Sequence, residues 1–355
     1  MSKQLISIAE SKALRGIAIL GIILHNYCHF LPVVQENEYT FESKWPSMLL
    51  KSVMGIGPNC MLDLFSFFGC YGVPVFLFVS GYGLVMKYEG ENTNVVKPIA
   101  FVSYHYLKLF RLMFLGYIAF VLVCFLHPSG YHDYTVGNIM AQMLMYINIL
   151  PDPDHIIKPG PYWFFGLMIE LYIVYRAFLY RRHWGVTVGM IIFCWLIQEF
   201  CDPAGDTINR LRYNFFSGML PFGVGILFAR YGRELKKTTY AVVTFVSVVI
   251  VCLSSFNFHA WLWTPLFVVT ATLGFVKILP ILIMKAFVWL GAISAALFVA
   301  HPITREIIIP MSYHGMVWTG IVIYLLTSIV LAWIFKYIFR YIPKPKLKTE
   351  IENRN

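Results

Sequence analysis

Long apolar stretches alternate with short polar segments along almost the whole chain. A helix rises about 1.5 Å per residue, so roughly 20 apolar residues cross a hydrocarbon core of about 30 Å. The sequence therefore predicts ten transmembrane helices, at approximately 13–33, 62–86, 106–127, 161–180, 185–201, 213–231, 239–256, 260–277, 284–304 and 316–340. The expected fold class is all-α, a polytopic membrane helical bundle in which residues 1–355 form one domain.

The composition supports a membrane protein. Hydrophobic residues make up 59% of the chain and charged residues only 13%, whereas a soluble chain has about a quarter of its residues charged. The net charge of +10 also suits nucleic-acid binding, but the cations lie between apolar segments, so we expect no nucleic-acid partner. The seven cysteines have no metal-ligand spacing, and we expect no metal site.

The positions of the cations predict the orientation in the membrane. An even number of spans places both termini on one side, which we assign to the cytoplasm because 22 of the 28 Lys and Arg then lie inside. The six that fall outside are Lys44, Lys51, Lys158, Arg210, Arg212 and Arg305. The basic tail that begins at Tyr341 is expected to lie against anionic membrane lipid.

The first span carries ionisable side chains where hydrocarbon is expected. His25 lies roughly 15 Å beyond Arg15 along a helix, about halfway through the bilayer. A histidine at that depth is either bonded to a neighbouring carbonyl group or functional, and we favour a catalytic role. His29, one turn later, is a second candidate. The ten residues from Arg15 to His25 leave them about 80° apart, so they serve one cavity from different angles or the helix is locally wide.

Two later spans carry further candidate catalytic residues. Glu170 lies about seven residues into the fourth span, where it should be protonated or paired with a histidine or arginine of another span. His301, at the outer end of the ninth span, is either a solvated surface histidine or part of the same site. A lone imidazole can act as a general base on a hydroxyl group, with a contribution of about 10²–10⁴-fold.

Four cations lie near the cytoplasmic end of the first and third spans: Lys12, Arg15, Lys108 and Arg111. They are either interface anchors or a binding site for a polyphosphorylated donor. In the second span, Ser80 is a further donor-site candidate, although small residues in membrane helices usually serve close packing. Candidate contacts to a second substrate are Asn26, Tyr82, Trp163 and Tyr172. Trp163 also fits an interfacial aromatic belt.

These residues favour a transfer reaction across the bilayer. The chain has no G-x-S-x-G elbow, Walker loop or H-E-x-x-H motif, so it gives no support to a serine hydrolase, an ATPase or a zinc protease. The alternative is a proton-coupled transporter or flippase that uses the intramembrane histidines and Glu170. We find no clear inverted repeat, which counts against a transporter. An accessory membrane subunit gives no reason to keep His25 in lipid.

A series of motifs resembles the integral-membrane acyltransferase family 3. The motifs occur in family order: Arg15-Gly-Ile-Ala-Ile-Leu followed by His25, Gly72-Val-x-Val-Phe76-x-x-x-Ser80-Gly81-Tyr82, Lys108 with Arg111, Tyr162-Trp163-Phe-Phe165 with Glu170-x-Tyr172, and Leu290-Gly291-x-x-Ser294-x-x-x-Phe298-x-x-His301-Pro302. Each pattern alone is loose, but five in order across the chain are fairly specific.

The resemblance implies an O-acyltransferase, usually an acetyltransferase, in the inner membrane of a bacterium. The donor substrate would be acetyl-CoA on the cytoplasmic side, and the acceptor a hydroxyl group of a cell-surface glycan or a lipid-linked sugar. His25 would be the catalytic histidine, as general base or acyl carrier, with Arg15 its motif partner on the donor side. Ser80 and Gly81 would belong to the second motif.

Overall fold

The computed structural model describes residues 4–34, 41, 45–90, 93, 95–126, 134–153 and 155–347. These residues form helices joined by short connections, and none of them forms a strand, so the expected all-α class is confirmed. The helices are α1 (Ile8–Cys28), α2 (Trp45–Val53), α3 (Cys60–Gly69), α4 (Gly72–Tyr88), α5 (Pro98–Leu126), α6 (Val136–Met143), η1 (Ile147–Ile149), η2 (Gly160–Tyr162), α7 (Trp163–Val174), η3 (Tyr175–Leu179), α8 (Trp184–Glu199), α9 (Asp206–Leu211), α10 (Phe215–Tyr231), α11 (Lys237–Ser254), α12 (Phe258–Trp261), α13 (Thr264–Ile278), α14 (Ile281–Gly291), α15 (Ser294–Tyr313) and α16 (Val317–Ile338).

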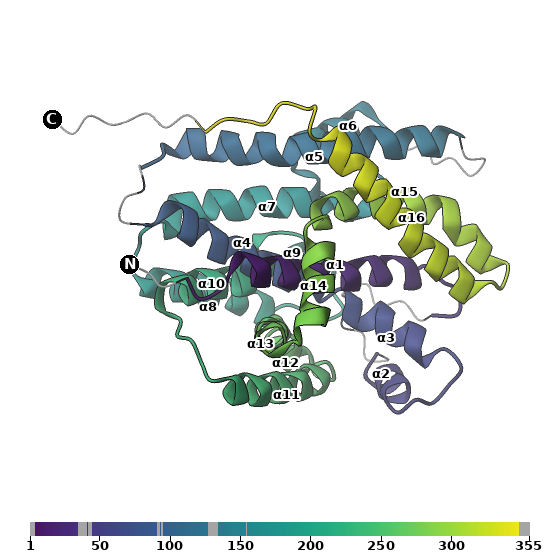
Figure 1. Ribbon diagram of the computed structural model, residues 1–355, viewed down its shortest axis with the longest axis horizontal. Helices are drawn as coiled ribbons and strands as arrows, with labels where there is room; N and C mark the ends of the chain where they lie inside the picture. The colour runs from purple at the N-terminus through teal and green to yellow at the C-terminus, as the bar shows by residue number, and fades with distance from the viewer. Residues whose placement is uncertain are drawn as a thin grey trace.

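Helix α1 is the centre of the bundle. It packs against α3, α4, α13, α14, α15 and α16, with α5 and α7 along the long axis of the molecule on one side and α11 at the opposite edge (Figure 1). Its start is fixed by a capping box, in which Ser7 Oγ accepts from Glu10 N at 3.1 Å and Ser7 N donates to the Glu10 carboxylate at 2.7 Å. It is α-helical over its full length, so it is not locally wide.

Glycines let the backbones of neighbouring helices approach α1 directly. A Cβ atom at Gly16 would lie 2.1 Å from Phe287 O of α14, and one at Gly69 of α3 would lie 2.4 Å from Gly21 O. Both separations are far below van der Waals contact, so only glycine fits at these crossings. Small residues at such crossings are typical of helices packed in membranes.

The second predicted span is interrupted at Cys70 and Tyr71, where α3 ends and α4 begins. Pro74 has no N–H group, so the carbonyl of Cys70 cannot receive the usual bond from the residue four positions later. Val73 N donates to Cys70 O at 3.1 Å instead, and this tighter turn breaks the helix. Together α3 and α4 still form one apolar segment of 29 residues.

The ninth predicted span consists of two helices, α14 and α15, which meet at an angle of 68°. Figure 1 shows α14 crossing α1 steeply before the chain turns into α15. Helix α15 continues to Tyr313, well beyond the expected end at residue 304. The span is therefore broken, and its second helix, α15, is longer than the apolar stretch indicates.

Each of the ten predicted spans coincides with a helix or a helix pair. Among the described residues, five helical segments are long and apolar enough to cross a membrane, and the bent pair of α14 and α15 makes a sixth. Helices α8, α10 and α13 are apolar but shorter, with 10–17 residues. The full count of ten spans and the cytoplasmic placement of both termini stay predictions.

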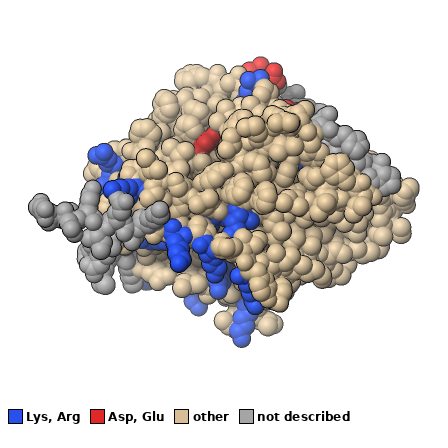
Figure 2. Space-filling model, turned by 90° about the horizontal axis from the view of Figure 1, so that it is seen from above, with Lys and Arg blue, Asp and Glu red and all other residues tan. Residues whose placement is uncertain are grey.

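The basic side chains gather toward one end of the molecule (Figure 2). There the last residues of α4 and α10 are joined by Arg230, which forms two hydrogen bonds with Glu89 at 2.6 and 2.8 Å. Arg230 also donates to Leu179 O at 2.8 Å, and Tyr175 OH donates to Glu89 at 2.9 Å. The ends of α4, α10 and the segment that continues α7 are thus fixed together at the basic end.

Candidate functional site

His25 is held in one orientation by the helix beside it. The side chain is buried, and its Nδ1 lies 2.5 Å from the backbone oxygen of Ser66 in α3. A carbonyl oxygen can only accept, so Nδ1 carries the proton in the neutral ring and the lone pair is on Nε2. Gly69, one turn after Ser66, permits this contact because a Cβ atom there would lie 2.7 Å from Cβ of His25.

His29 lies next to His25 on the same face of α1. The ring centroids are 4.8 Å apart in an edge-to-face arrangement, and His29 Nδ1 is 3.4 Å from His25 Nε2. This is a long hydrogen bond, so it holds His25 Nε2 only weakly. The other nitrogen of His29, Nε2, is buried and has no hydrogen-bond partner in the described part of the chain.

Both histidines line a pocket between α1, α4, α7 and α15, with about 890 Å³ of empty space that includes its open mouth. We call it the histidine pocket; it is lined by Ile22, His25, Asn26, His29, Phe30, Cys70, Val73, His155, Lys158, Gly160, Pro161, Trp163, Phe164, Phe298 and Arg305. The sequence-predicted residues that the structure brings together here are His25, His29, Asn26 and Trp163. The lining combines apolar side chains with a few polar and charged ones, which is typical of small-molecule binding sites.

Arg305 is part of this pocket, although the sequence analysis counted it only among the cations on the outer side of the membrane. Helix α15 continues past residue 304, the expected end of the span, and Arg305 is only 4% exposed. Its guanidinium group donates to Asn26 O at 3.2 Å and stacks on the ring of Phe30 at 4.0 Å. The pocket thus contains a buried fixed cation close to both histidines.

His301 lies one turn before Arg305 on α15 and is fully buried. Its Nδ1 is 3.2 Å from Leu297 O, and its Nε2 has no hydrogen-bond partner among the described residues. It lies within electrostatic range of His25 and Arg305 but does not line the histidine pocket. It stands behind Phe298, with ring centroids 5.8 Å apart, so it supports the pocket wall.

Among the described residues Glu170 pairs with neither a histidine nor an arginine, so only one of the two expected states, the protonated one, remains open. Its carboxylate accepts from Asn148 Nδ2 at 2.8 Å and from Phe215 N at 2.7 Å. Glu170 therefore joins η1 to the first turn of α10. There its carboxylate accepts from a backbone N–H group that has no partner within the helix. Glu170 does not line the histidine pocket.

The predicted cytoplasmic cations do not form one cluster. Lys108 lies within electrostatic range of Arg15 and of Lys87. Arg15 in turn faces Tyr172, which stacks on His105 with ring centroids 4.3 Å apart. Arg15, Lys87 and Lys108 form what we call the basic cluster. Arg15 lies about 15 Å from His25 along α1.

Two of the predicted donor-site cations lie apart from this contact. Arg111 is turned toward α16, where its guanidinium group is 5.5 Å from the ring of Phe339. It borders a groove together with Lys344 of the C-terminal tail. Lys12 is half-buried one turn before Arg15 on α1.

Ser80 and Tyr82 have structural contacts in α4. Ser80 Oγ donates to Phe76 O of its own helix at 2.8 Å, and the adjacent Gly81 lies against the backbone of Phe222 in α10. The hydroxyl group of Tyr82 accepts from Leu5 N at 3.1 Å and from Ile6 N at 3.0 Å, which anchors the segment before α1. Neither residue lines the histidine pocket.

Three basic residues near His25 were missed as site residues by sequence reasoning. Lys158 and Arg305 line the histidine pocket, and Arg212 lies within electrostatic range of His25. The sequence analysis counted all three only as cations on the outer side of the membrane. The four-residue spacing from His301 to Arg305 was the signal that could have identified one of them, because such residues share a helix face.

Comparison with known families agrees with the motif pattern. The chain matches the model of acyltransferase family 3, an acyltransferase domain, over residues 8–337. It therefore belongs to this family, and it is an acyltransferase built as an integral, multi-pass membrane protein. Searches of the curated proteins and of the solved structures gave no significant match.

The contact between Gly69 and His25 makes a specific prediction. In the variant Gly69→Ala, the new methyl group would overlap Gly21 O and Cβ of His25, so α3 must move away and the Ser66 carbonyl must leave Nδ1. We expect the acyl-transfer rate to fall at least tenfold, with the protein still present in the membrane. Gly83→Ala in α4 is the matched control, because a Cβ atom there meets nothing within 4 Å. Equal activity of the two variants would contradict the proposed role of this crossing.

Proposed function

We propose that the protein transfers an acetyl group from acetyl-CoA to a hydroxyl group of a cell-surface glycan or glycolipid, with His25 as the general base. The observation that carries this proposal is the orientation of the His25 ring. Its Nδ1 is engaged by the Ser66 carbonyl, which leaves the lone pair on Nε2, and the side chain lines the histidine pocket. The membership in an acyltransferase family supports the reaction class.

In the proposed reaction, His25 Nε2 removes the proton of the acceptor hydroxyl group while the hydroxyl oxygen attacks the thioester carbonyl. The tetrahedral intermediate collapses with loss of the CoA thiolate, which takes the proton from Nε2 and leaves as the thiol. The products are an O-acetyl ester and free CoA, and His25 returns to its starting state. Arg305 supplies a buried positive charge beside the negative charge that develops on the carbonyl oxygen.

The two substrates would approach from opposite ends of α1. Phosphate groups of the donor suit the basic cluster of Arg15, Lys87 and Lys108, because fixed cations there attract a polyanion. The thioester then has to reach His25 along about 15 Å of helix. The acceptor suits the histidine pocket, whose borders include Lys158 and the connection before α7. We infer from the family resemblance that the membrane is the inner membrane of a bacterium.

Replacement of His25 tests the base. His25→Ala removes the only group assigned to proton transfer, so we expect transfer of labelled acetate from acetyl-CoA to fall by about 10²–10⁴-fold. His314→Ala is the control, since His314 is exposed at the end of α15. Membrane levels of both variants should match the wild type. Full acetylation by the His25→Ala variant would rule out the proposed mechanism.

Replacement of Lys108 tests the donor site. Lys108 is exposed, so Lys108→Gln should leave the fold intact and remove one cation that faces the donor phosphates. A charge-assisted contact contributes about 1.5–3 kcal/mol, so we expect the KM for acetyl-CoA to rise roughly tenfold with little change in the KM for the acceptor. Lys285→Gln, which removes another exposed cation in α14, is the control. An unchanged donor KM in the Lys108→Gln variant would place the phosphates elsewhere.

A further inference from the structure

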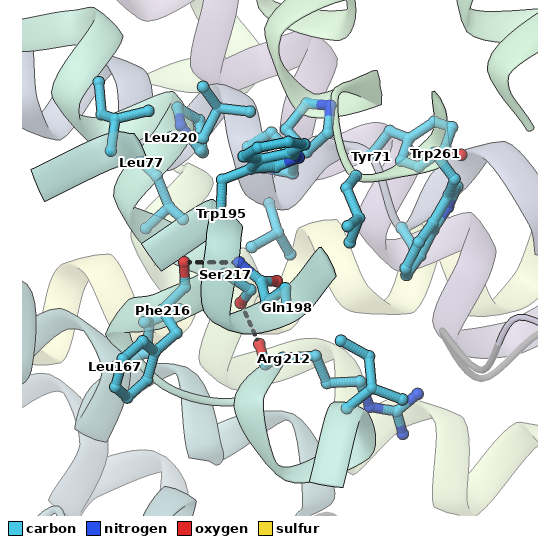
Figure 3. A pocket seen from close by; sticks show the side chains of 18 of the residues that line it. Tyr71, Leu77, Leu167, Trp195, Gln198, Arg212, Phe216, Ser217, Leu220 and Trp261 are labelled. Atoms are coloured by element: carbon cyan, nitrogen blue, oxygen red, sulfur yellow. Dashed lines mark hydrogen bonds between the residues drawn. The ribbon is translucent and has the colours of Figure 1, made fainter. Parts of the chain in front are cut away.

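A second pocket lies beside the histidine pocket and has a different chemical character. It lies between α4, α7, α8, α10 and α13, with about 880 Å³ of empty space that includes its open mouth, and we call it the apolar pocket. Figure 3 shows aromatic and aliphatic side chains around it, among them Tyr71, Leu77, Leu167, Trp195, Leu220 and Trp261. The family comparison assigns no ligand to it.

Two polar side chains of the apolar pocket, Gln198 and Ser217, are engaged with backbone carbonyl groups. Gln198 Nε2 donates to Phe216 O at 3.1 Å and to Cys194 O at 3.0 Å, and Ser217 Oγ donates to Arg212 O at 2.6 Å (Figure 3). The remaining polar groups of the lining include the Arg212 guanidinium group and the indole N–H of Trp195, which has no hydrogen-bond partner among the described residues. Most of the wall is aromatic or aliphatic, so it is better suited to a hydrocarbon chain than to a sugar.

The two pockets meet at a common wall. Cys70, Val73 and Trp163 line both of them. Arg212 lines the apolar pocket and also lies within electrostatic range of His25. A molecule with its polar end at His25 would therefore place an attached hydrocarbon chain next to or within the apolar pocket.

The position of the apolar pocket along the bundle indicates which of the two substrates carries the hydrocarbon chain. The apolar pocket is lined by the first residues of α4, α7 and α10 and by the last half of α8. The opposite ends of α4 and α10 meet at the Glu89–Arg230 pair, at the basic end of the molecule. The pocket thus lies away from the basic cluster proposed for the donor, and an acetyl donor has no long chain that would fill it.

We propose that the apolar pocket binds the hydrocarbon chain of a lipid-linked acceptor, while the sugar of that acceptor occupies the histidine pocket. This inference rests on the proposed function, since it names the class of acceptor for the same site. The chain would pass beside Trp163, whose ring lies 5.0 Å from that of Tyr213 and separates the two pockets. Recognition of the acceptor would then require both its sugar and its lipid.

Photolabelling tests the proposal without reference to activity. The probe is dodecyl glucoside with a diazirine at the end of its chain, added to the full-length protein in phosphatidylcholine nanodiscs. We expect labelling of α8 and α10 at residues such as Trp195 and Leu220, mapped by peptide mass spectrometry. In Ile191→Trp, which fills the pocket, this labelling should fall at least fivefold. Ile192→Trp is the matched control, because Ile192 is 45% exposed and its buried neighbour Ile191 is 7% exposed.

Three labelling results would overturn the proposal. Labelling that is unchanged in Ile191→Trp would show that the chain lies elsewhere. Equal labelling of the pocket by a diazirine phosphatidylcholine would show a site for any membrane lipid. Labelling by a diazirine long-chain acyl-CoA that is lost in Ile191→Trp would assign the pocket to the donor chain.

A kinetic experiment separates this proposal from the proposed function. The kcat/KM of the wild type divided by that of Ile191→Trp should be near 1 for methyl glucoside and above 10 for dodecyl glucoside. Burial of each methylene group changes the binding constant by about fourfold. Partitioning of the glucoside into the membrane is the same for both proteins, so it cancels in the ratio of wild type to variant. A ratio near 1 for both acceptors would contradict the chain site. Failure of the wild type to acetylate either glucoside would count against the proposed function. The labelling would still show whether the apolar pocket binds the hydrocarbon chain.

Discussion

The site depends on one close contact, in which α3 lies against α1 so that the Ser66 carbonyl reaches Nδ1 of His25. The contact exists because neither Gly69 nor its partner Gly21 has a side chain. A carbonyl oxygen that is only an acceptor determines which ring nitrogen carries the proton. The packing of two helices therefore sets the tautomer of His25, because it leaves the lone pair on Nε2, as the proposed mechanism requires.

The rest of the molecule arranges two chemically different ends around this histidine. Arg15 and Lys108 lie within electrostatic range of each other at the basic end, and the Glu89–Arg230 pair joins α4 and α10 there. The histidine pocket and the apolar pocket share a wall nearer the opposite end of the same helices. This arrangement suits a reaction in which a charged donor and a lipid-linked acceptor meet inside the membrane without competing for the same surface.

The sequence predicts the helices well, because apolar stretches of membrane length leave little choice of structure. It also singles out His25, whose burial in an apolar segment is costly. It fails at Arg305, because an apolar run ends at the first charge while the helix itself continues to Tyr313. It also fails for the partners of Glu170, which are an amide group and a backbone N–H from distant segments. Such contacts depend on tertiary packing, which no local pattern encodes.

The tautomer of His25 tests the central claim most directly. Nitrogen-15 NMR of histidine-labelled protein in nanodiscs, with the His25 signal assigned by its loss in a His25 variant, distinguishes a protonated ring nitrogen from one with a lone pair. At pH 8 we predict that Nδ1 carries the proton and that Nε2 has the lone pair, as the bond to Ser66 O requires. A proton on Nε2 with a bare Nδ1 would contradict the account, because the Ser66 carbonyl could then not hold the ring and Nε2 could not act as the base.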